Sequence, residues 1–198
     1  MYICDRKNRV EHGPLRIIIT TDEETTMKGI CSISPKHFED AKYVINLDSD
    51  SLEEITVSSA SCNTICATKH FENLAPKHLS AVELKIDNLK GGHSGTDIGK
   101  QRTNANIAMG KLLNMIDKKA DFELAYIRGG NAHNAIASAC SGVICINAED
   151  INAVKNIASE LQTALRQAYD DREANVCVNP AQAPKFVMSK KNKTDLLQ

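Results

Sequence analysis

Hydrophobic and polar residues follow two different periods in the second half of the chain. Four stretches alternate or run apolar in the manner of β-strands, and two repeat apolar residues at helical spacing. The expected strands are residues 79–87, 122–127, 138–146 and 174–178, and the expected helices are residues 105–116 and 151–169. The order strand, helix, strand, strand, helix, strand predicts a ferredoxin-like domain, in which a four-stranded antiparallel sheet carries two helices on one face.

Two helices cover only one face of such a sheet. The opposite face and the edge strands would remain free, and pairing with a second copy of the chain is the natural way to bury them. The pattern therefore predicts a homodimer that forms through this domain.

The first part of the chain has a different pattern. Residues 15–21 and 43–48 are apolar runs typical of strands buried on both faces of a parallel sheet. Carboxylates follow these runs, and α/β sheets bind ligands at the carboxyl ends of their strands. We therefore expect Glu23, Glu24 and Asp48 to meet at one rim as oxygen ligands of a divalent metal. A solvated acidic turn is the alternative for the Glu23–Glu24 pair.

A glycine-dense turn, residues 90–98, separates the first expected strand of the second half from its first expected helix. Gly91, Gly92 and Gly95 permit left-handed or closely approached backbone, which favours a surface at which His93 meets a ligand. The alternative is a plain strand-to-helix connection that carries a solvated histidine.

Composition narrows the class of protein. The 198 residues carry a net charge of -1, so no basic surface indicates binding to nucleic acid or to an anionic membrane. Seven scattered cysteines form no zinc-ribbon spacing, and no segment has the apolar length of a membrane span. The first residues also lack the apolar core of a secretion signal. We therefore expect a reduced, cytoplasmic protein.

Five motifs, taken together, resemble a known enzyme family. They are TDEETTMKG at residues 21–29, INLDSD at 45–50, LKGGHSGTDI at 89–98, NAN at 104–106 and GGNAHNAI at 129–136. In this order they resemble the aminoacyl-histidine dipeptidases, also called peptidase D or Xaa-His dipeptidases, which are similar to carnosinase among the two-zinc metallopeptidases.

The resemblance implies a role for each candidate residue. Glu23 matches the general base that activates the metal-bridging water, and Glu24 and Asp48 match ligands of the two zinc ions. His93 matches a lid-domain histidine that binds the substrate carbonyl in the partner subunit's site and stabilises the oxyanion. Asn134 matches a lid asparagine that contacts substrate. The implied ligands are a short peptide and two zinc ions per complete site, and the implied assembly is a homodimer formed through the lid domain.

The resemblance also implies a division of the chain. Residues 1–63 would be part of the α/β catalytic domain of a di-zinc peptidase, residues 64–184 the ferredoxin-like lid and dimerisation domain, and residues 185–198 the start of the returning catalytic segment. Deprived of its central strands, the first part is expected to expose apolar edges.

Two functions stay open at this point. The family's His-x-Asp motif and its last histidine ligand have no match in the sequence. We therefore expect a portion of a zinc-dependent dipeptidase that hydrolyses Xaa-His and other short peptides, inactive alone because its metal site is incomplete. The alternative is a non-catalytic dimerisation or interaction module derived from the lid domain.

Overall fold

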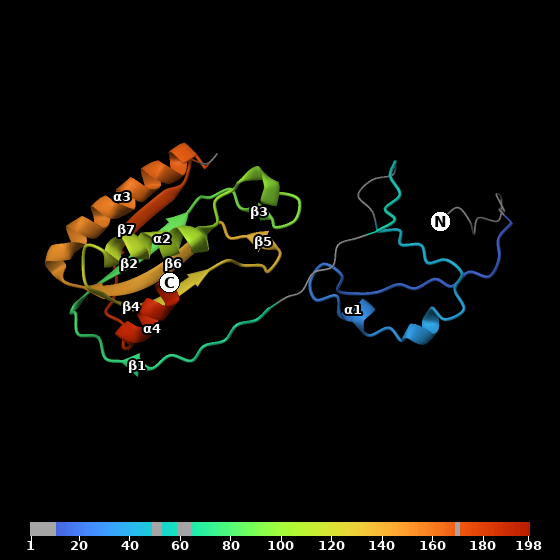
Figure 1. Ribbon diagram of the computed structural model, residues 1–198, viewed down its shortest axis with the longest axis horizontal. Helices are drawn as coiled ribbons and strands as arrows, with labels where there is room; N and C mark the ends of the chain where they lie inside the picture. Colours follow the sequence, from blue (N-terminus) through green and yellow to red (C-terminus); the bar gives the residue numbers. More distant parts are fainter. Residues whose placement is uncertain (1–10, 49–52, 59–64, 169–170) are drawn as a thin grey trace. The chain divides into compact units, whose positions relative to one another are not determined.

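The computed structural model describes residues 11–48, 53–58, 65–168 and 171–198. The chain divides into two compact units, Met1–Thr64 and Ile65–Gln198. The second unit contains a four-stranded sheet and both long helices (Figure 1).

The four-stranded sheet has the predicted topology. Its strands are β2 (Ser80–Asp87), β4 (Phe122–Gly129), β6 (Cys140–Ile146) and β7 (Asn175–Pro180), in the spatial order β4-β6-β2-β7, and every neighbouring pair is antiparallel. Helices α2 (Ala105–Asp117) and α3 (Ile151–Ala168) lie on one face of the sheet. The strand and helix order confirms the ferredoxin-like fold.

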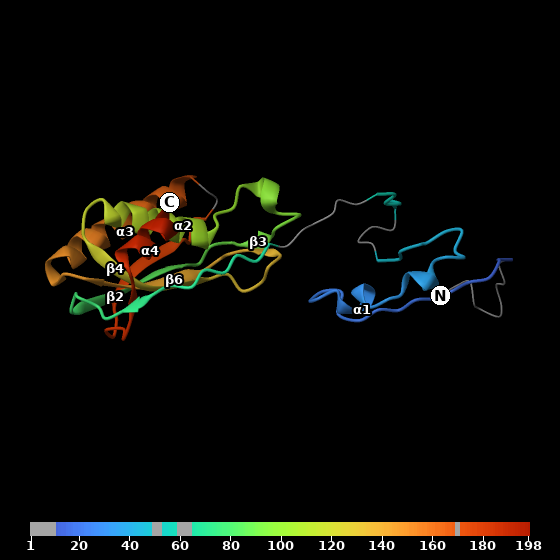
Figure 2. The same cartoon turned by 60° about the horizontal axis from the view of Figure 1, so that its bottom comes forward.

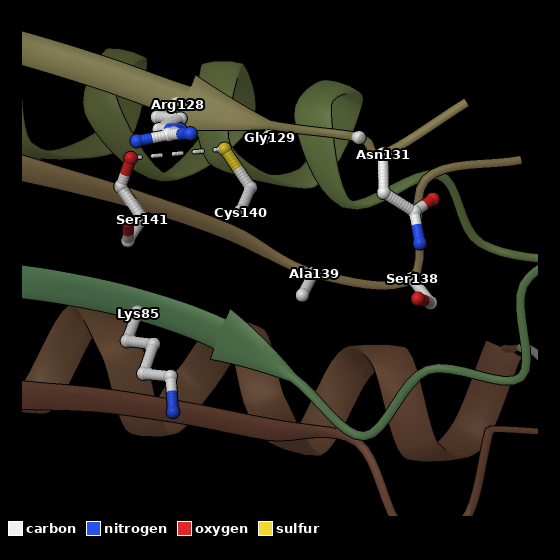
Figure 3. Close-up of a pocket in the computed structure, with 9 residues that line it drawn as sticks. Lys85, Arg128, Gly129, Asn131, Ser138, Ala139, Cys140 and Ser141 are labelled. Atoms are coloured by element: carbon white, nitrogen blue, oxygen red, sulfur yellow. Dashed lines mark hydrogen bonds between the residues drawn. The ribbon is translucent and has the colours of Figure 1, made fainter. Parts of the chain in front are cut away.

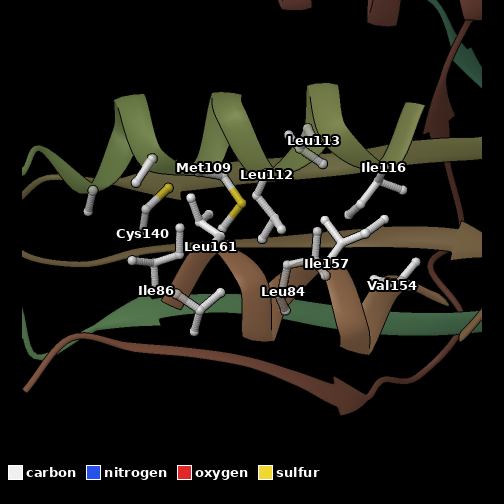
Figure 4. Close-up of a cluster of buried hydrophobic side chains, with 14 of the residues drawn as sticks. Leu84, Ile86, Met109, Leu112, Leu113, Ile116, Cys140, Val154, Ile157 and Leu161 are labelled. Atoms are coloured by element: carbon white, nitrogen blue, oxygen red, sulfur yellow. The ribbon is translucent and has the colours of Figure 1, made fainter. Parts of the chain in front are cut away.

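The apolar stripes of the two helices form the core against the sheet (Figure 4). Helix α2 begins at its N-cap Asn104, whose side chain accepts the Asn106 N–H at 2.9 Å. Fully buried core side chains come from both helices and from the strands, and they include Leu84, Ile86, Met109, Leu112, Ile116, Ile144 and Val154.

A β-bulge redirects strand β4 near its middle. Before the bulge, Leu124 pairs with Ile144 in the core, and after it Tyr126 pairs with Val143 on the opposite face. Arg128, two residues further, pairs with Ser141 on that same face. The extra residue therefore lets Ile127 pack against the core, while Tyr126 and Arg128 face the opposite side.

The sheet face opposite α2 and α3, here called the helix-free face, is partly covered. Val187 is 2% exposed in a small cluster with Ala81, Val143 and Cys145. It belongs to β8 (Val187–Met188), which pairs antiparallel with β1 (Asn73–Leu74). In Figure 2 helices α2 and α3 lie above the sheet, so that the helix-free face is below. The prediction of a wholly free face was wrong at this end, because a later segment of the same chain packs there.

The last helix, α4 (Lys190–Leu197), packs on the same unit through a buried lysine. Lys193 is 3% exposed, and its Nζ donates to Asp117 Oδ1 at 2.7 Å and to the Phe122 carbonyl at 2.9 Å. The same ammonium lies 4.0 Å from the centre of the Phe122 ring. In this structure residues 185–198 therefore form part of the lid unit, and their role as a returning catalytic segment stays a prediction.

The prediction of two buried strands in the first unit was wrong. In its described residues, 11–48 and 53–58, this unit has a short helix α1 (Lys28–Cys31) and a 3-10 turn η2 (Pro35–His37), but residues 15–21 and 43–48 form no strand. Ile19 is 88% exposed and Leu47 84% exposed, so neither run is covered. A buried strand needs hydrogen-bonded neighbours on its edges, and the described part of this unit supplies none.

Candidate functional site

The candidate site is a small two-stranded ribbon beside the main sheet. Strand β3 (Gly92–His93) pairs antiparallel with β5 (Ala135–Ile136), so that His93 lies opposite Ala135. The next backbone contact runs from the Ser94 N–H to the Asn134 carbonyl at 2.9 Å. The two lid residues implied by the family resemblance, His93 and Asn134, are thereby brought to the same ribbon from distant parts of the sequence.

The ring of His93 is held in one orientation by its own loop. Its Nδ1 accepts the backbone N–H of Gly95 at 3.1 Å and that of Thr96 at 3.3 Å. A ring nitrogen that accepts hydrogen bonds carries no proton, so in the neutral ring the proton is on Nε2. Since His93 is exposed, the loop presents an imidazole N–H donor at the surface.

An acid and two bases brace this loop. Asp97 Oδ2 accepts the His93 N–H at 2.9 Å, and Oδ1 receives the Lys100 ammonium at 2.7 Å. Arg102 lies 3.4 Å from the same oxygen and donates to the Gly91 carbonyl. The Lys100 ammonium, followed by the His93 N–H, holds the pKa of the Asp97 carboxyl below its usual value. Asp97 is therefore charged at neutral pH and fixes the backbone of His93.

Two glycines make this bracing possible. Gly91 and Gly92 have φ angles of 60° and 141°, a region that residues with a side chain rarely adopt. A Cβ on Gly92 would lie 2.6 Å from Asp97 Oδ2 and 2.6 Å from Arg102 Nη1. The glycine-dense turn thus brings backbone close to an ion pair of the same loop, and the approach of a ligand to His93 stays a prediction.

The three acidic candidates lie in the first unit. Glu23 and Glu24 are exposed in a turn that follows Asp22, whose φ is 59° and whose carbonyl accepts the Met27 N–H at 2.7 Å. Asp48 is exposed, and its N–H donates to Asn46 Oδ1 at 3.0 Å. The expected sheet rim that would gather these carboxylates does not form in the described residues.

Carboxylates suit a divalent metal, but the described residues do not complete a centre. Within residues 11–48, 53–58, 65–168 and 171–198, no group of three or more histidine, cysteine, aspartate or glutamate side chains is placed to hold a metal ion. Glu24 and Asp48 alone do not fit two zinc ions, since each zinc ion takes about four ligands. Their roles, and those of Glu23, His93 and Asn134, stay predictions.

Sequence reasoning missed the part played by Asp97 and Arg102. An acid four residues after the central histidine of a glycine-rich turn was the available signal, because such a carboxylate can reach back to the histidine backbone. The position of Arg102 after the following 3-10 turn, η3 (Ile98–Lys100), gave no comparable signal.

Comparison with known proteins finds a family match within the second unit. Residues 77–173 match the peptidase dimerisation domain of the M20 family. The chain is 28% identical over 170 residues to the cytosol non-specific dipeptidase of Escherichia coli K12, covering 85% of this chain and 35% of that protein. It therefore spans about a third of the length of this curated relative.

A solved structure supports the fold independently. Aminoacylhistidine dipeptidase from Vibrio alginolyticus superposes with a TM-score of 0.60 and 23% sequence identity, over 64% of this chain and 27% of that one. The agreement confirms the ferredoxin-like lid architecture. In the described residues no helix is long and apolar enough to cross a membrane.

Proposed function

We propose that the chain is the lid and a portion of the catalytic site of a zinc-dependent dipeptidase that hydrolyses Xaa-His and other short peptides, because residues 77–173 match the M20 peptidase dimerisation domain. The Escherichia coli relative is a dipeptidase by name, and its similarity extends over 170 residues, well beyond the dimerisation domain. A cytoplasmic location, which the relative's name states for that protein, is part of the proposal.

One observation carries this proposal: His93 presents a fixed Nε2–H donor on the ribbon whose other strand follows Asn134. Peptide hydrolysis passes through a tetrahedral intermediate whose carbonyl oxygen becomes an oxyanion, and a preorganised donor stabilises that charge. His93 would supply this donor, because its Nδ1 is occupied by two backbone N–H groups. The Asn134 side chain, just before β5, would hold the peptide from the other side of the ribbon.

A homodimer is the second part of the proposal. Strands β4 and β7 are the two edges of the sheet in the described residues, and an unpaired edge readily joins another chain. In the proposed dimer His93 acts in the partner's site, and Glu23 takes the proton of the attacking water in its own. Glu24 and Asp48 are proposed as zinc ligands, and the remaining ligands must come from outside the described residues.

A chimera tests the proposed function. Residues 77–173 would replace the aligned segment of the Escherichia coli dipeptidase, which supplies the rest of the catalytic site. We expect hydrolysis of an Xaa-His dipeptide, a kcat at least about 100-fold lower in the His93→Ala form, consistent with the loss of one oxyanion donor, and a raised KM in the Asn134→Ala form. The matched control is His133→Ala, on the loop between β4 and β5. A chimera that binds metal and dimerises yet hydrolyses no dipeptide would contradict the proposal.

A non-catalytic dimerisation module is the second candidate. The unit Ile65–Gln198 has its own hydrophobic core, whereas apolar residues of the first unit such as Ile19 and Leu47 are exposed. Sedimentation, zinc content and dipeptide hydrolysis of the purified chain separate the candidates. A dimer without zinc or turnover, combined with an inactive chimera, favours the module.

A further inference from the structure

The helix-free face carries a cavity at the end of the sheet from which the β3–β5 ribbon extends (Figure 3). It has a volume of about 270 Å³ and is open to solvent. Its polar side chains come from three strands, from the loop after β4 and from the loop before β6: Lys85, Arg128, Asn131, Ser138 and Ser141.

The strand register sets three of these side chains in a row. Arg128 on β4 pairs with Ser141 on β6, and Ser141 pairs with Lys85 on β2. Residues directly opposite in antiparallel strands project on the same face. In Figure 3 the Arg128 guanidinium lies beside Ser141, and Asn131 and Ser138 lie at the loop end of the cavity.

The two cationic side chains at the cavity differ in whether they have an acidic partner. Lys85 binds Asp87 at 2.7 Å, and Asp87 also accepts the Asn175 amide at 2.9 Å. Glu83, two residues before Lys85 on the same strand, adds a further negative charge. Arg128, by contrast, has no hydrogen-bond or ion-pair partner among the residues that the structure describes. The cavity therefore contains one guanidinium whose five N–H donors bond no described protein group and can exchange water for a ligand.

We propose that this cavity binds the carboxylate of a small molecule, with Arg128 as the charged donor and Asn131, Ser138 and Ser141 as neutral donors. The planar guanidinium fork matches a carboxylate in a bidentate pair, and hydroxyl and amide donors satisfy its remaining lone pairs. The volume of about 270 Å³ lies just below the usual range of small-molecule sites, which limits the ligand to an amino acid or a short peptide. The site goes beyond the proposed hydrolysis and does not depend on it.

Titration of the full 198-residue chain, followed by backbone amide NMR, tests the proposal. The probe is N-acetylglycine, which carries one carboxylate and no amine, and the control probe is N-acetylglycinamide, which lacks the charge. We expect the amides of Gly129, Gly130 and Asn131 to shift with the first probe only, and the affinity to fall with added salt. Glycine and glycylglycine then identify the source of the carboxylate, according to which binds more tightly.

Variants test whether Arg128 is the cation that binds the carboxylate. Arg128→Gln should weaken binding of N-acetylglycine about tenfold or more, the equivalent of about 1.4 kcal/mol. Arg128→Lys should recover part of the affinity, because an ammonium keeps the charge but not the fork. Arg172→Gln, an exposed arginine that does not line the cavity, is the matched control and should leave binding unchanged. Since Arg128 is exposed, core amides should be unaffected in every variant.

Two results would overturn the proposal. One is equal shifts with N-acetylglycine and N-acetylglycinamide, which would mean that the carboxylate is not recognised. The other is an unchanged affinity of Arg128→Gln for N-acetylglycine, which would mean that the guanidinium does not hold the ligand.

Discussion

Replacement of Gly92 by alanine tests whether the ribbon depends on close approach between backbone and ion pair. The φ of Gly92 is 141°, and an added Cβ would lie 2.6 Å from both Asp97 Oδ2 and Arg102 Nη1. Backbone in such a sparsely populated region costs about 1–3 kcal/mol, before the contact itself is counted. At about 1.4 kcal/mol for each factor of ten, this corresponds to roughly a 5- to 150-fold shift toward an open loop.

Amide hydrogen exchange of His93 and Ser94 reports this opening directly. Their N–H groups donate to Asp97 Oδ2 and to the Asn134 carbonyl, so both should exchange faster in the Gly92→Ala variant by about the factor given above. Gly99→Ala is the matched control, because a Cβ there would meet nothing within 4 Å. Equal exchange rates in the two variants would mean that the close approach at Gly92 does not hold the loop closed.

Four further variants or conditions test other parts of the structure. Gly110→Ala, inside α2 with open space around its Cα, should raise the free energy of unfolding by about 0.8–1.0 kcal/mol in a urea titration. Leu112→Ala, in the core at 0% exposure, should lower it by about 2–5 kcal/mol in the same titration. Lys193→Met should lower it by about 1.5–3 kcal/mol, because the ion pair and hydrogen bonds that hold α4 are lost. Because the pKa of Asp97 is lowered on folding, exchange protection of the His93 amide should be constant above the ordinary aspartate pKa and be lost as pH falls through the lower folded value. Unfolding free energies that move in the opposite direction, or protection that is lost only at high pH, would contradict these expectations.

The lid fold was predictable because its signals are local. Helix α3 shows a clear apolar stripe at Val154, Ile157, Ala158, Leu161 and Leu165, and all five side chains are buried. In a strand such as β2, the alternation of apolar and polar residues indicates by itself which side chains face the core. The order of such elements then restricts the topology to few choices.

The first unit shows where this reasoning fails. The apolar runs 15–21 and 43–48 have the composition of buried strands, but a strand forms only when another strand pairs with it. Glu23, Glu24 and Asp48 could be placed at one rim only if that sheet existed. Local composition does not specify the presence of a partner strand.

The candidate site was predictable in part. The turn at residues 90–98 and the position of His93 followed from the glycines, whereas the pairing of its strand with the segment after Asn134 was not predicted. The Asp97–Arg102 brace depends on a three-dimensional loop path that no periodicity encodes. Val187 packs on the helix-free face, and this contact likewise depends on the three-dimensional path of a segment distant in the sequence.

The proposed oxyanion role of His93 depends on an Nε2–H donor in a fixed tautomer. The most direct test is to record the ring nitrogens of His93 in the ¹⁵N-labelled chain by long-range ¹H–¹⁵N NMR at neutral pH. We expect one tautomer, with Nδ1 unprotonated and Nε2 protonated, because the Gly95 and Thr96 N–H groups bind Nδ1. A protonated Nδ1, or averaging between both tautomers as in a free histidine, would contradict it.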